Sequence, residues 1–268
     1  MADTESLTGR PAPLEKRTIA AGAGPITCHA VGEGPAVILL ASVGRGAGDL
    51  FALATALSTL GLRAVLPEPR GVNGSTPTPA QTLHDFADDV AAVARTEGGR
   101  VIVAGHAYGA SVARAFAQRY PDSVRGVALL AIGAPGYPKR LGALIDGLAS
   151  AAGSEESRRA ALLEAFFVSQ DRIAPWLVGW HPALIAMQRR AIARLPGREW
   201  TGTGNAPVLD LMGAADPFRP EESRDAIAAE LGARVTCHLM RDVRHALPDE
   251  KPGETAGILA RWARSLEA

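Results

Sequence analysis

Short apolar runs alternate with segments of helical periodicity along most of the chain. The runs rich in Val, Ile and Leu are AVILLAS, LRAVLPEP, VIVAGH, VRGVALLAIG, APVLDLMGAADP and RVTCHLM, which begin at positions 36, 62, 101, 124, 206 and 234. Runs of this length and composition are typical of strands buried on both faces of a sheet. Because helical segments separate them, the pattern predicts an α/β protein with a mostly parallel, twisted sheet and helices on both faces.

The helical segments carry start and stop signals. We expect the first helix to be opened by Asp49 and ended by Gly61, and the next to be capped by Thr82. Another helix is expected from about Pro220 to Leu231, between the last two apolar runs. These helices have the lengths needed to connect parallel strands.

Residues 135–203 interrupt the alternation. They contain no strand-like run, only amphipathic pieces such as LGALIDGL, RRAALLEAFF and ALIAMQRRAIARL. We therefore expect a sheet-forming core of residues 1–134 and 204–268, with 135–203 inserted as a helical cap. Four apolar side chains of this segment are candidates for a substrate pocket, and equally for the interior of the cap itself: Phe167, Trp176, Trp180 and Met187.

The segment Gly-His-Ala-Tyr-Gly at 105–109 lies where a buried strand passes directly into a helix. Small residues on both sides of such a corner permit a strained backbone at its centre and close packing of helix on strand. The centre is Ala107, so the corner presents a methyl group. Later in the chain Asp216 follows one strand, in GAADPFRP, and His245 follows the last strand, in RDVRHALPDE.

This order of nucleophile position, acid and histidine resembles the α/β-hydrolase family, from about residue 17 to the C-terminus. The resemblance implies an α/β-hydrolase fold with a helical cap insertion, and it assigns Asp216 and His245 to a catalytic dyad. It also implies an oxyanion hole made by the backbone N–H groups of Val43, after the first parallel strand, and Tyr108, after the nucleophile position.

The chain departs from the family pattern at two places. The His-Gly pair that often opens the oxyanion loop is Ala-Ser here, and Ala107 stands where the family has Ser, Cys or Asp. Neither Ser42 nor Ser111 lies at the apex of the corner, so we assign neither as a nucleophile. His106 is expected to be a packing residue that points away from the site.

Simpler structural roles stay open for the two dyad residues. Asp216 precedes Pro217, and an aspartate before proline commonly forms a side-chain turn. His245 is also compatible with an ordinary surface histidine. Their positions after two successive strands favour the dyad.

The amino-acid composition limits which classes of partner are expected. Lys plus Arg and Asp plus Glu both number 28, so the net charge is zero, which argues against nucleic acid or an anionic membrane and favours a small, roughly neutral ligand. Cys28 and Cys237 lack metal-ligand spacing. We therefore expect buried free thiols, a cytoplasmic location, no metal and no cofactor. No apolar stretch approaches the roughly 18 residues of a membrane-spanning helix.

Three interpretations account for Ala107. The chain is a serine esterase whose serine was replaced to trap a ligand, a natural alanine enzyme, or a non-catalytic pseudoenzyme that keeps the pocket for binding. A conventional serine cycle is excluded, because loss of the serine costs about a millionfold in a well-studied protease. We favour the natural alanine enzyme, because the Asp216–His245 dyad is retained and because GHA(F/Y)G resembles native family members. In it, His245 acts as a general base on water or on an acidic proton of a small, largely apolar ester or carbonyl compound.

Overall fold

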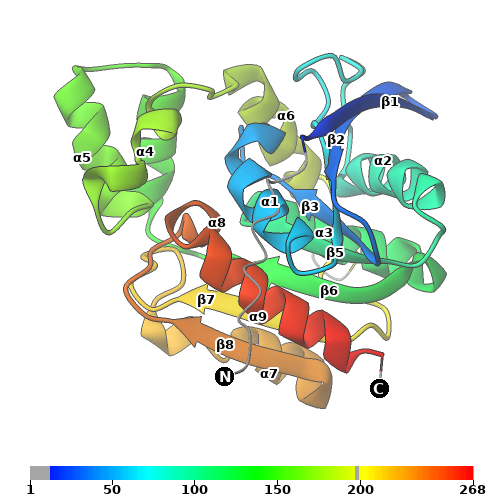
Figure 1. The fold of residues 1–268 in the computed structure, drawn as a ribbon. Coiled ribbons are helices and arrows are strands. Elements are labelled where there is room, and N and C mark those ends of the chain that lie inside the picture. Colours follow the sequence, from blue (N-terminus) through cyan, green and yellow to red (C-terminus); the bar gives the residue numbers. More distant parts are fainter. Residues whose placement is uncertain (1–12, 197–198, 268) are drawn as a thin grey trace, which may run out of the picture.

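The computed structural model describes residues 13–196 and 199–267, which form one eight-stranded sheet with helices on both faces (Figure 1). The sheet order is β1-β2-β4-β3-β5-β6-β7-β8, with β1, β2 and β4 paired antiparallel and the pairs from β4 to β8 parallel. The strands are β1 (Glu15–Ala21), β2 (Gly24–Val31), β3 (Ala36–Leu40), β4 (Arg63–Pro67), β5 (Val101–His106), β6 (Val124–Leu130), β7 (Val208–Gly213) and β8 (Val235–Met240).

Six of these strands coincide with the apolar runs of the sequence, and the β1–β2 hairpin is an addition. β1 is mostly exposed, and its sequence EKRTIAA mixes charged and apolar residues. An edge strand of this kind lacks the continuous apolar signal of a strand covered on both faces.

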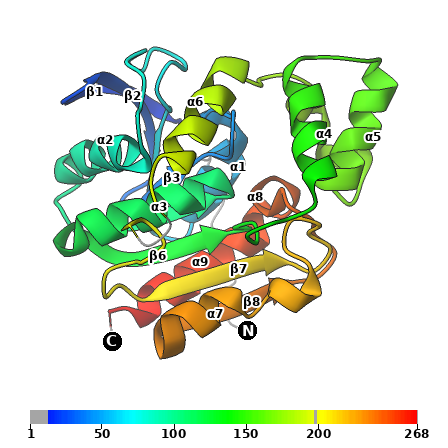
Figure 2. The ribbon, with the colours of Figure 1, turned by 180° about the vertical axis from the view of Figure 1, so that it is seen from behind.

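Two groups of helices cover the sheet (Figures 1 and 2). Helices α1, α8 and α9 share a buried apolar cluster with one face, and α2, α3 and α7 share a second cluster with the other face. Their bounds are α1 (Phe51–Ser58), α2 (Leu83–Thr96), α3 (Tyr108–Arg119), α7 (Ala226–Leu231), α8 (Leu247–Glu250) and α9 (Pro252–Ser265).

Helix starts agree with the sequence at one position and differ at two. Thr82 caps α2, and the Asp85 carboxylate accepts a hydrogen bond from the Thr82 backbone N–H at 2.8 Å. Asp49 does not cap α1, because its carboxylate binds Arg45 instead and a 3-10 turn, Ala47–Leu50, precedes the helix. The expected helix from 220 to 231 is a 3-10 turn followed by the shorter α7.

The segment between β6 and β7 is helical, as the sequence predicts. It contains α4 (Lys139–Ala149), α5 (Glu155–Ala165) and α6 (Pro182–Ala193), and its described residues hold no β-structure beyond one bridge between Thr203 and Asn205. Figure 1 shows α4 and α5 side by side, with α6 between them and the β1–β2 hairpin. Buried side chains of α4 and α5 share a cluster with Ile185 of α6 and with Phe218 and Ala246, which follow β7 and β8.

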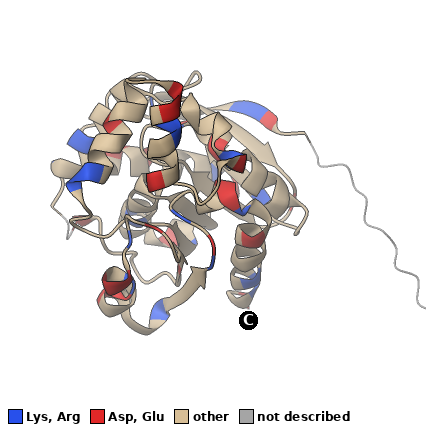
Figure 3. Cartoon of the chain, turned by 90° about the vertical axis from the view of Figure 1, so that its left-hand side faces the viewer, with Lys and Arg blue, Asp and Glu red and all other residues tan. Residues whose placement is uncertain are grey.

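Charges of both signs are mixed over the side of the molecule seen in Figure 3. Among the residues described, none of the helices has the length and apolar character required to span a bilayer. Over the same ranges, no group of three or more His, Cys, Asp or Glu side chains is placed to hold a metal ion.

Both cysteines are free, but only Cys28 is buried. Cys237 is exposed on the edge strand β8, so the expectation of two buried thiols is wrong for Cys237.

Candidate active site

The corner between β5 and α3 has the strained backbone that its sequence predicts. Ala107 has φ 50° and ψ −107°, a conformation that costs of order 1–3 kcal/mol for a residue with a Cβ. Its backbone N–H donates to the Leu130 carbonyl at 2.9 Å, which ties the apex to β6. The strain is therefore held in place by the sheet and not by the side chain at the apex.

Two glycines make this corner possible through close packing. A Cβ on Gly105 would lie 2.1 Å from the Gly109 carbonyl carbon and oxygen, and one on Gly109 would lie 2.4 Å from the Leu40 carbonyl oxygen. Real Cβ atoms do not approach backbone this closely, so α3 can start directly on the end of β5 only with glycine at both positions.

Asp216 and His245 meet at the carboxyl ends of the strands. The Asp216 Oδ2 and His245 Nδ1 atoms are 2.9 Å apart, and both side chains are almost fully buried. Asp216 Oδ1 accepts the Phe218 backbone N–H at 2.8 Å, so the residue also forms the side-chain turn expected before Pro217. The two roles proposed for Asp216 thus use different oxygens. His245 is not a surface histidine.

The loop that carries Asp216 is anchored by a buried ion pair that the sequence analysis missed. The Arg219 guanidinium lies 2.8 Å from Asp210 on β7 and donates to the Ile132 carbonyl at 3.2 Å. Burial raises the pKa of Asp210, and Arg219 opposes that rise. An aspartate within the apolar run APVLDLMG was the available signal, because a carboxylate is rarely buried in a strand without a partner.

His106 supports the His245 loop from below. It is fully buried, and its Nε2 is 2.8 Å from the backbone carbonyl oxygen of His245, so Nε2 carries the proton and donates. Burial, together with the nearby His245, lowers the pKa of His106 from 6.5 to about 3. It does not line the cavity described below, in agreement with the packing role expected for it.

We expect His106→Gln to weaken the acid sensitivity of folding. Below pH 6.5 the unfolded chain binds a proton at His106 that the folded chain does not, so stability falls on acidification by up to about 1.4 kcal/mol per pH unit. Glutamine donates a similar hydrogen bond without titrating. Between pH 7 and pH 5 the variant should lose about 2 kcal/mol less than the native chain in urea unfolding. If His106→Gln, the native chain and the exposed control variant His238→Gln all lost the same unfolding free energy over this pH range, the prediction would be contradicted.

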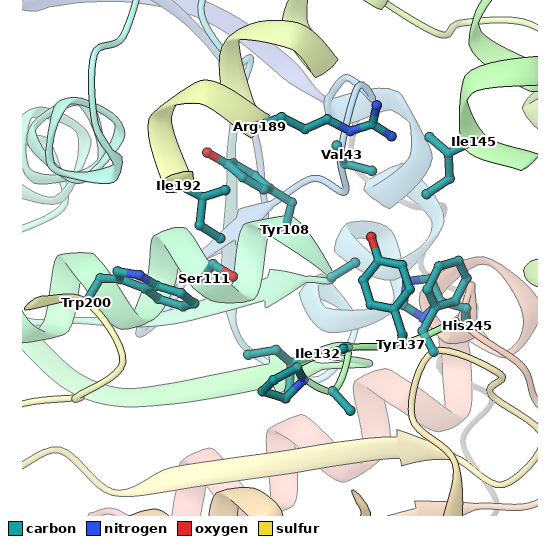
Figure 4. Close-up of a pocket in the computed structure, with 16 residues that line it drawn as sticks. Val43, Tyr108, Ser111, Ile132, Tyr137, Ile145, Arg189, Ile192, Trp200 and His245 are labelled. Carbon is teal, nitrogen blue, oxygen red and sulfur yellow. The ribbon is translucent and has the colours of Figure 1, made fainter. Parts of the chain in front are cut away.

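The two proposed oxyanion residues lie together. Val43, in the loop after β3, and Tyr108, the first residue of α3, both line one cavity (Figure 4). Neither backbone N–H has an acceptor among the described residues. Helix α6 holds this region, since Gln188 Oε1 accepts the Gly44 N–H at 2.8 Å and the Gln188 carbonyl accepts the Tyr108 hydroxyl at 3.2 Å. Both amides are thus available to an oxyanion.

Arg45 joins the loop after β3 to the helical segment 135–203. Its buried guanidinium binds the Asp49 carboxylate through two hydrogen bonds of 2.6 and 2.8 Å and donates to the Val178 carbonyl at 2.6 Å. It also lies 4.7 Å from the ring centroid of Trp176 and 4.8 Å from that of Trp180. An arginine with hydrogen bonds and aromatic faces on its planar group is well suited to such a buried junction.

The structure does not place the four aromatic and methionine candidates at the cavity, and this corrects the pocket assignment. Phe167 and Trp176 are buried in an apolar cluster that joins the segment 135–203 to the core, and Trp180 packs against the same cluster. The Met187 sulfur accepts the Ala80 N–H at 3.2 Å, in the core beneath α6. Their role is packing: Phe167, Trp176 and Trp180 belong to or pack against one buried cluster, and Met187 belongs to the cluster beside the sheet.

The cavity beside Ala107 and His245 has a volume of about 350 Å³ and mostly apolar walls. Figure 4 shows Trp200 and Ser111 on one side, and Tyr137, Ile145 and His245 on the other. Arg189 is the charged residue at its rim, and that side chain is half-exposed and paired with Asp146 at 2.6 Å. Residues of the segment 135–203 contribute to the lining that the sequence did not identify: Tyr137, Ile145, Arg189, Ile192 and Trp200.

A buried acid–histidine pair, a strained strand-to-helix corner and two free amides at the carboxyl ends of parallel strands define the class of α/β-hydrolase-fold proteins. A model of the Alpha/beta hydrolase family matches residues 37–258. The chain therefore belongs to this family of hydrolases, and the predicted fold is confirmed.

Solved structures with the same fold include several hydrolases. A thermophilic esterase from Thermogutta terrifontis, with malate bound, has a TM-score of 0.71 and 22% identity, over 96% of this chain and 100% of that one. Naproxen esterase (carboxylesterase NP) from Bacillus subtilis has a TM-score of 0.74 and 16% identity, over 94% and 92%. E-2-(Acetamidomethylene)succinate hydrolase has a TM-score of 0.71 and 20% identity, over 94% of this chain and 100% of that one. A search of curated proteins gives no match.

Proposed function

We propose that the chain is an α/β-hydrolase-fold enzyme that acts on a small, largely apolar ester or carbonyl compound by general-base catalysis, without a covalent intermediate at position 107. The observation that carries this proposal is the buried 2.9 Å contact between His245 and Asp216 beside a mostly apolar cavity. The cavity size suits a small ligand, since known small-molecule sites occupy about 300–1,000 Å³.

The proposed reaction uses His245 as the base. Asp216 accepts a hydrogen bond from the protonated Nδ1 of His245, which leaves Nε2 with a free lone pair, and no described residue is bonded to Nε2. Nε2 takes a proton from bound water as the water oxygen attacks the substrate carbonyl, and the carbonyl oxygen becomes negative. The amides of Val43 and Tyr108 stabilise that oxyanion. When the tetrahedral species collapses, His245 returns the proton to the leaving group, so the cycle is balanced.

The same base serves a carbon acid. If the substrate carries an acidic C–H next to its carbonyl, Nε2 of His245 removes that proton and the oxyanion hole holds the resulting enolate. Ala107 matters in both cases, because a methyl group leaves beside the histidine the space that a serine hydroxyl fills in a conventional esterase.

The energetics favour an enzyme over a binding module. A binder requires neither a strained alanine at a corner nor a buried carboxylate paired with an imidazole, and both features cost free energy unless other contacts offset them. Retention of both, next to two unpaired amides, supports a catalytic role.

The test of this proposal compares the unmodified chain with Ala107→Ser. We expect the unmodified protein to turn over at least one member of a panel of p-nitrophenyl esters and β-dicarbonyl compounds, and the serine to leave that rate unchanged or lower it, because the hydroxyl displaces water or substrate. Initial rates with each compound check this. A gain of about 10³-fold or more in ester hydrolysis would instead identify a serine esterase that carries alanine. Lack of turnover by both proteins would favour the binding module.

A further inference from the structure

Ser111 places a hydroxyl group in the cavity that the proposed reaction does not use. It lies on α3, four residues after Ala107, and lines the cavity, yet only 7% of the residue is exposed. Among the described residues the Ser111 hydroxyl has no hydrogen-bond partner, although seventy other hydrogen bonds that involve side chains are present. Figure 4 shows it between Trp200 and the side where His245 lies.

Local structure does not account for this serine. Helical serines commonly donate to the carbonyl one turn earlier, but the Ala107 carbonyl accepts the Ala110 N–H at 3.0 Å and no bond from Ser111. Alanine forms helices better than serine, so helix propensity does not account for a serine at this position. The walls around it include Ile132 and Ile192, which offer no polar side chain. The hydroxyl is therefore placed to bind a polar atom of a ligand in the cavity.

We propose that Ser111 is a specificity-determining residue that donates a hydrogen bond to a second oxygen of the substrate; this rests on the proposed function for the position of the reacting carbonyl. Four helical residues rise about 6 Å, which is the spacing along α3 between Ala107 and Ser111. A hydroxyl at that distance reaches an oxygen about three to five bonds from the reacting carbonyl carbon. The substrate class is therefore an apolar ester or ketone with an ether, keto or hydroxyl oxygen on the arm that points toward Trp200.

Pairs of unreactive ketones that differ by one oxygen test this inference. In 5-phenoxypentan-2-one an ether oxygen lies four bonds from the carbonyl carbon, and 6-phenylhexan-2-one has CH₂ in its place. Two further pairs, with one CH₂ fewer or one more in the chain, place the oxygen one bond nearer to the carbonyl carbon or one bond farther from it. Ser111→Thr and Ser111→Val form a matched pair, since the two side chains have the same shape and only threonine keeps the hydroxyl. Ser111→Ala removes the hydroxyl without adding volume.

Dissociation constants from calorimetry give the result. We expect the native chain and Ser111→Thr to bind at least one ether ketone about threefold to tenfold more tightly than its CH₂ partner, and Ser111→Val and Ser111→Ala to lose that preference. Three results would overturn the proposal. The preference for the ether ketone persists in Ser111→Val and Ser111→Ala, the native chain shows no preference, or none of the ketones binds. These ketones have no leaving group and are not hydrolysed, and calorimetry measures their binding alone, so the outcome is independent of whether His245 is the base.

Discussion

Replacement of His245 by alanine is expected to lower turnover by about 10² to 10⁴-fold, the range that a positioned general base contributes. Because the apex residue is Ala107, no side-chain nucleophile at the corner can carry the reaction once the base is lost. The imidazole is almost fully buried and held by Asp216 at 2.9 Å, so its removal takes away a group whose position is already fixed for catalysis. Initial rates on the best compound of the ester and β-dicarbonyl panel measure the effect.

The matched control for this experiment is His238→Ala. His238 lies exposed on β8, away from the strand ends that carry the dyad, and its loss should leave the rate unchanged. Turnover that survives the loss of His245 would remove the general-base mechanism. Thermal unfolding of both variants separates a catalytic effect from loss of structure.

Gly105→Ala is expected to destabilise the fold by more than about 4 kcal/mol, or to prevent folding, which places it among the largest effects of single substitutions. The added Cβ would lie 2.1 Å from the backbone of Gly109 and 2.4 Å from the Ala110 nitrogen. Both contacts involve backbone atoms, so no change of rotamer relieves them, and α3 must move away from β5.

Gly147→Ala is the control for backbone entropy and helix propensity. Gly147 lies within α4, and a Cβ there has no heavy atom within 4 Å. This variant should gain up to about 1 kcal/mol, because alanine is the better helix former. Urea unfolding of the two variants and the native chain provides the comparison. Similar stabilities for Gly105→Ala and the native chain would show that the corner does not depend on this close contact.

The sequence revealed the sheet and the corner because both depend on local, repeated signals. A strand covered on both faces must be apolar throughout, and a strand-to-helix corner must have small residues at fixed spacing, as at Gly105 and Gly109. The order of Asp216 and His245 after successive strands follows from the parallel topology, which brings the ends of these strands to one edge.

The cavity lining could not be read from the sequence in the same way. An amphipathic helix shows which of its faces is apolar but not whether that face meets a cavity or another helix. Ile145 lines the cavity and Trp176 does not, although both are apolar residues of helical segments and belong to the same buried cluster. The Asp210–Arg219 pair depends likewise on a tertiary contact between a strand and a loop.

The unequal attachment of the cap bears on how a ligand reaches the site and leaves it. Helix α6 is fixed to the oxyanion loop, since the N–H of Gly44 binds Gln188 and its carbonyl accepts the His181 N–H at 3.0 Å. Helix α4 meets α6 through the exposed pair of Arg189 and Asp146, which contributes little, and through the buried cluster that holds Ile145 and Ile185. Movement of α4 relative to α6 would therefore leave the two hydrogen bonds of Gly44 intact.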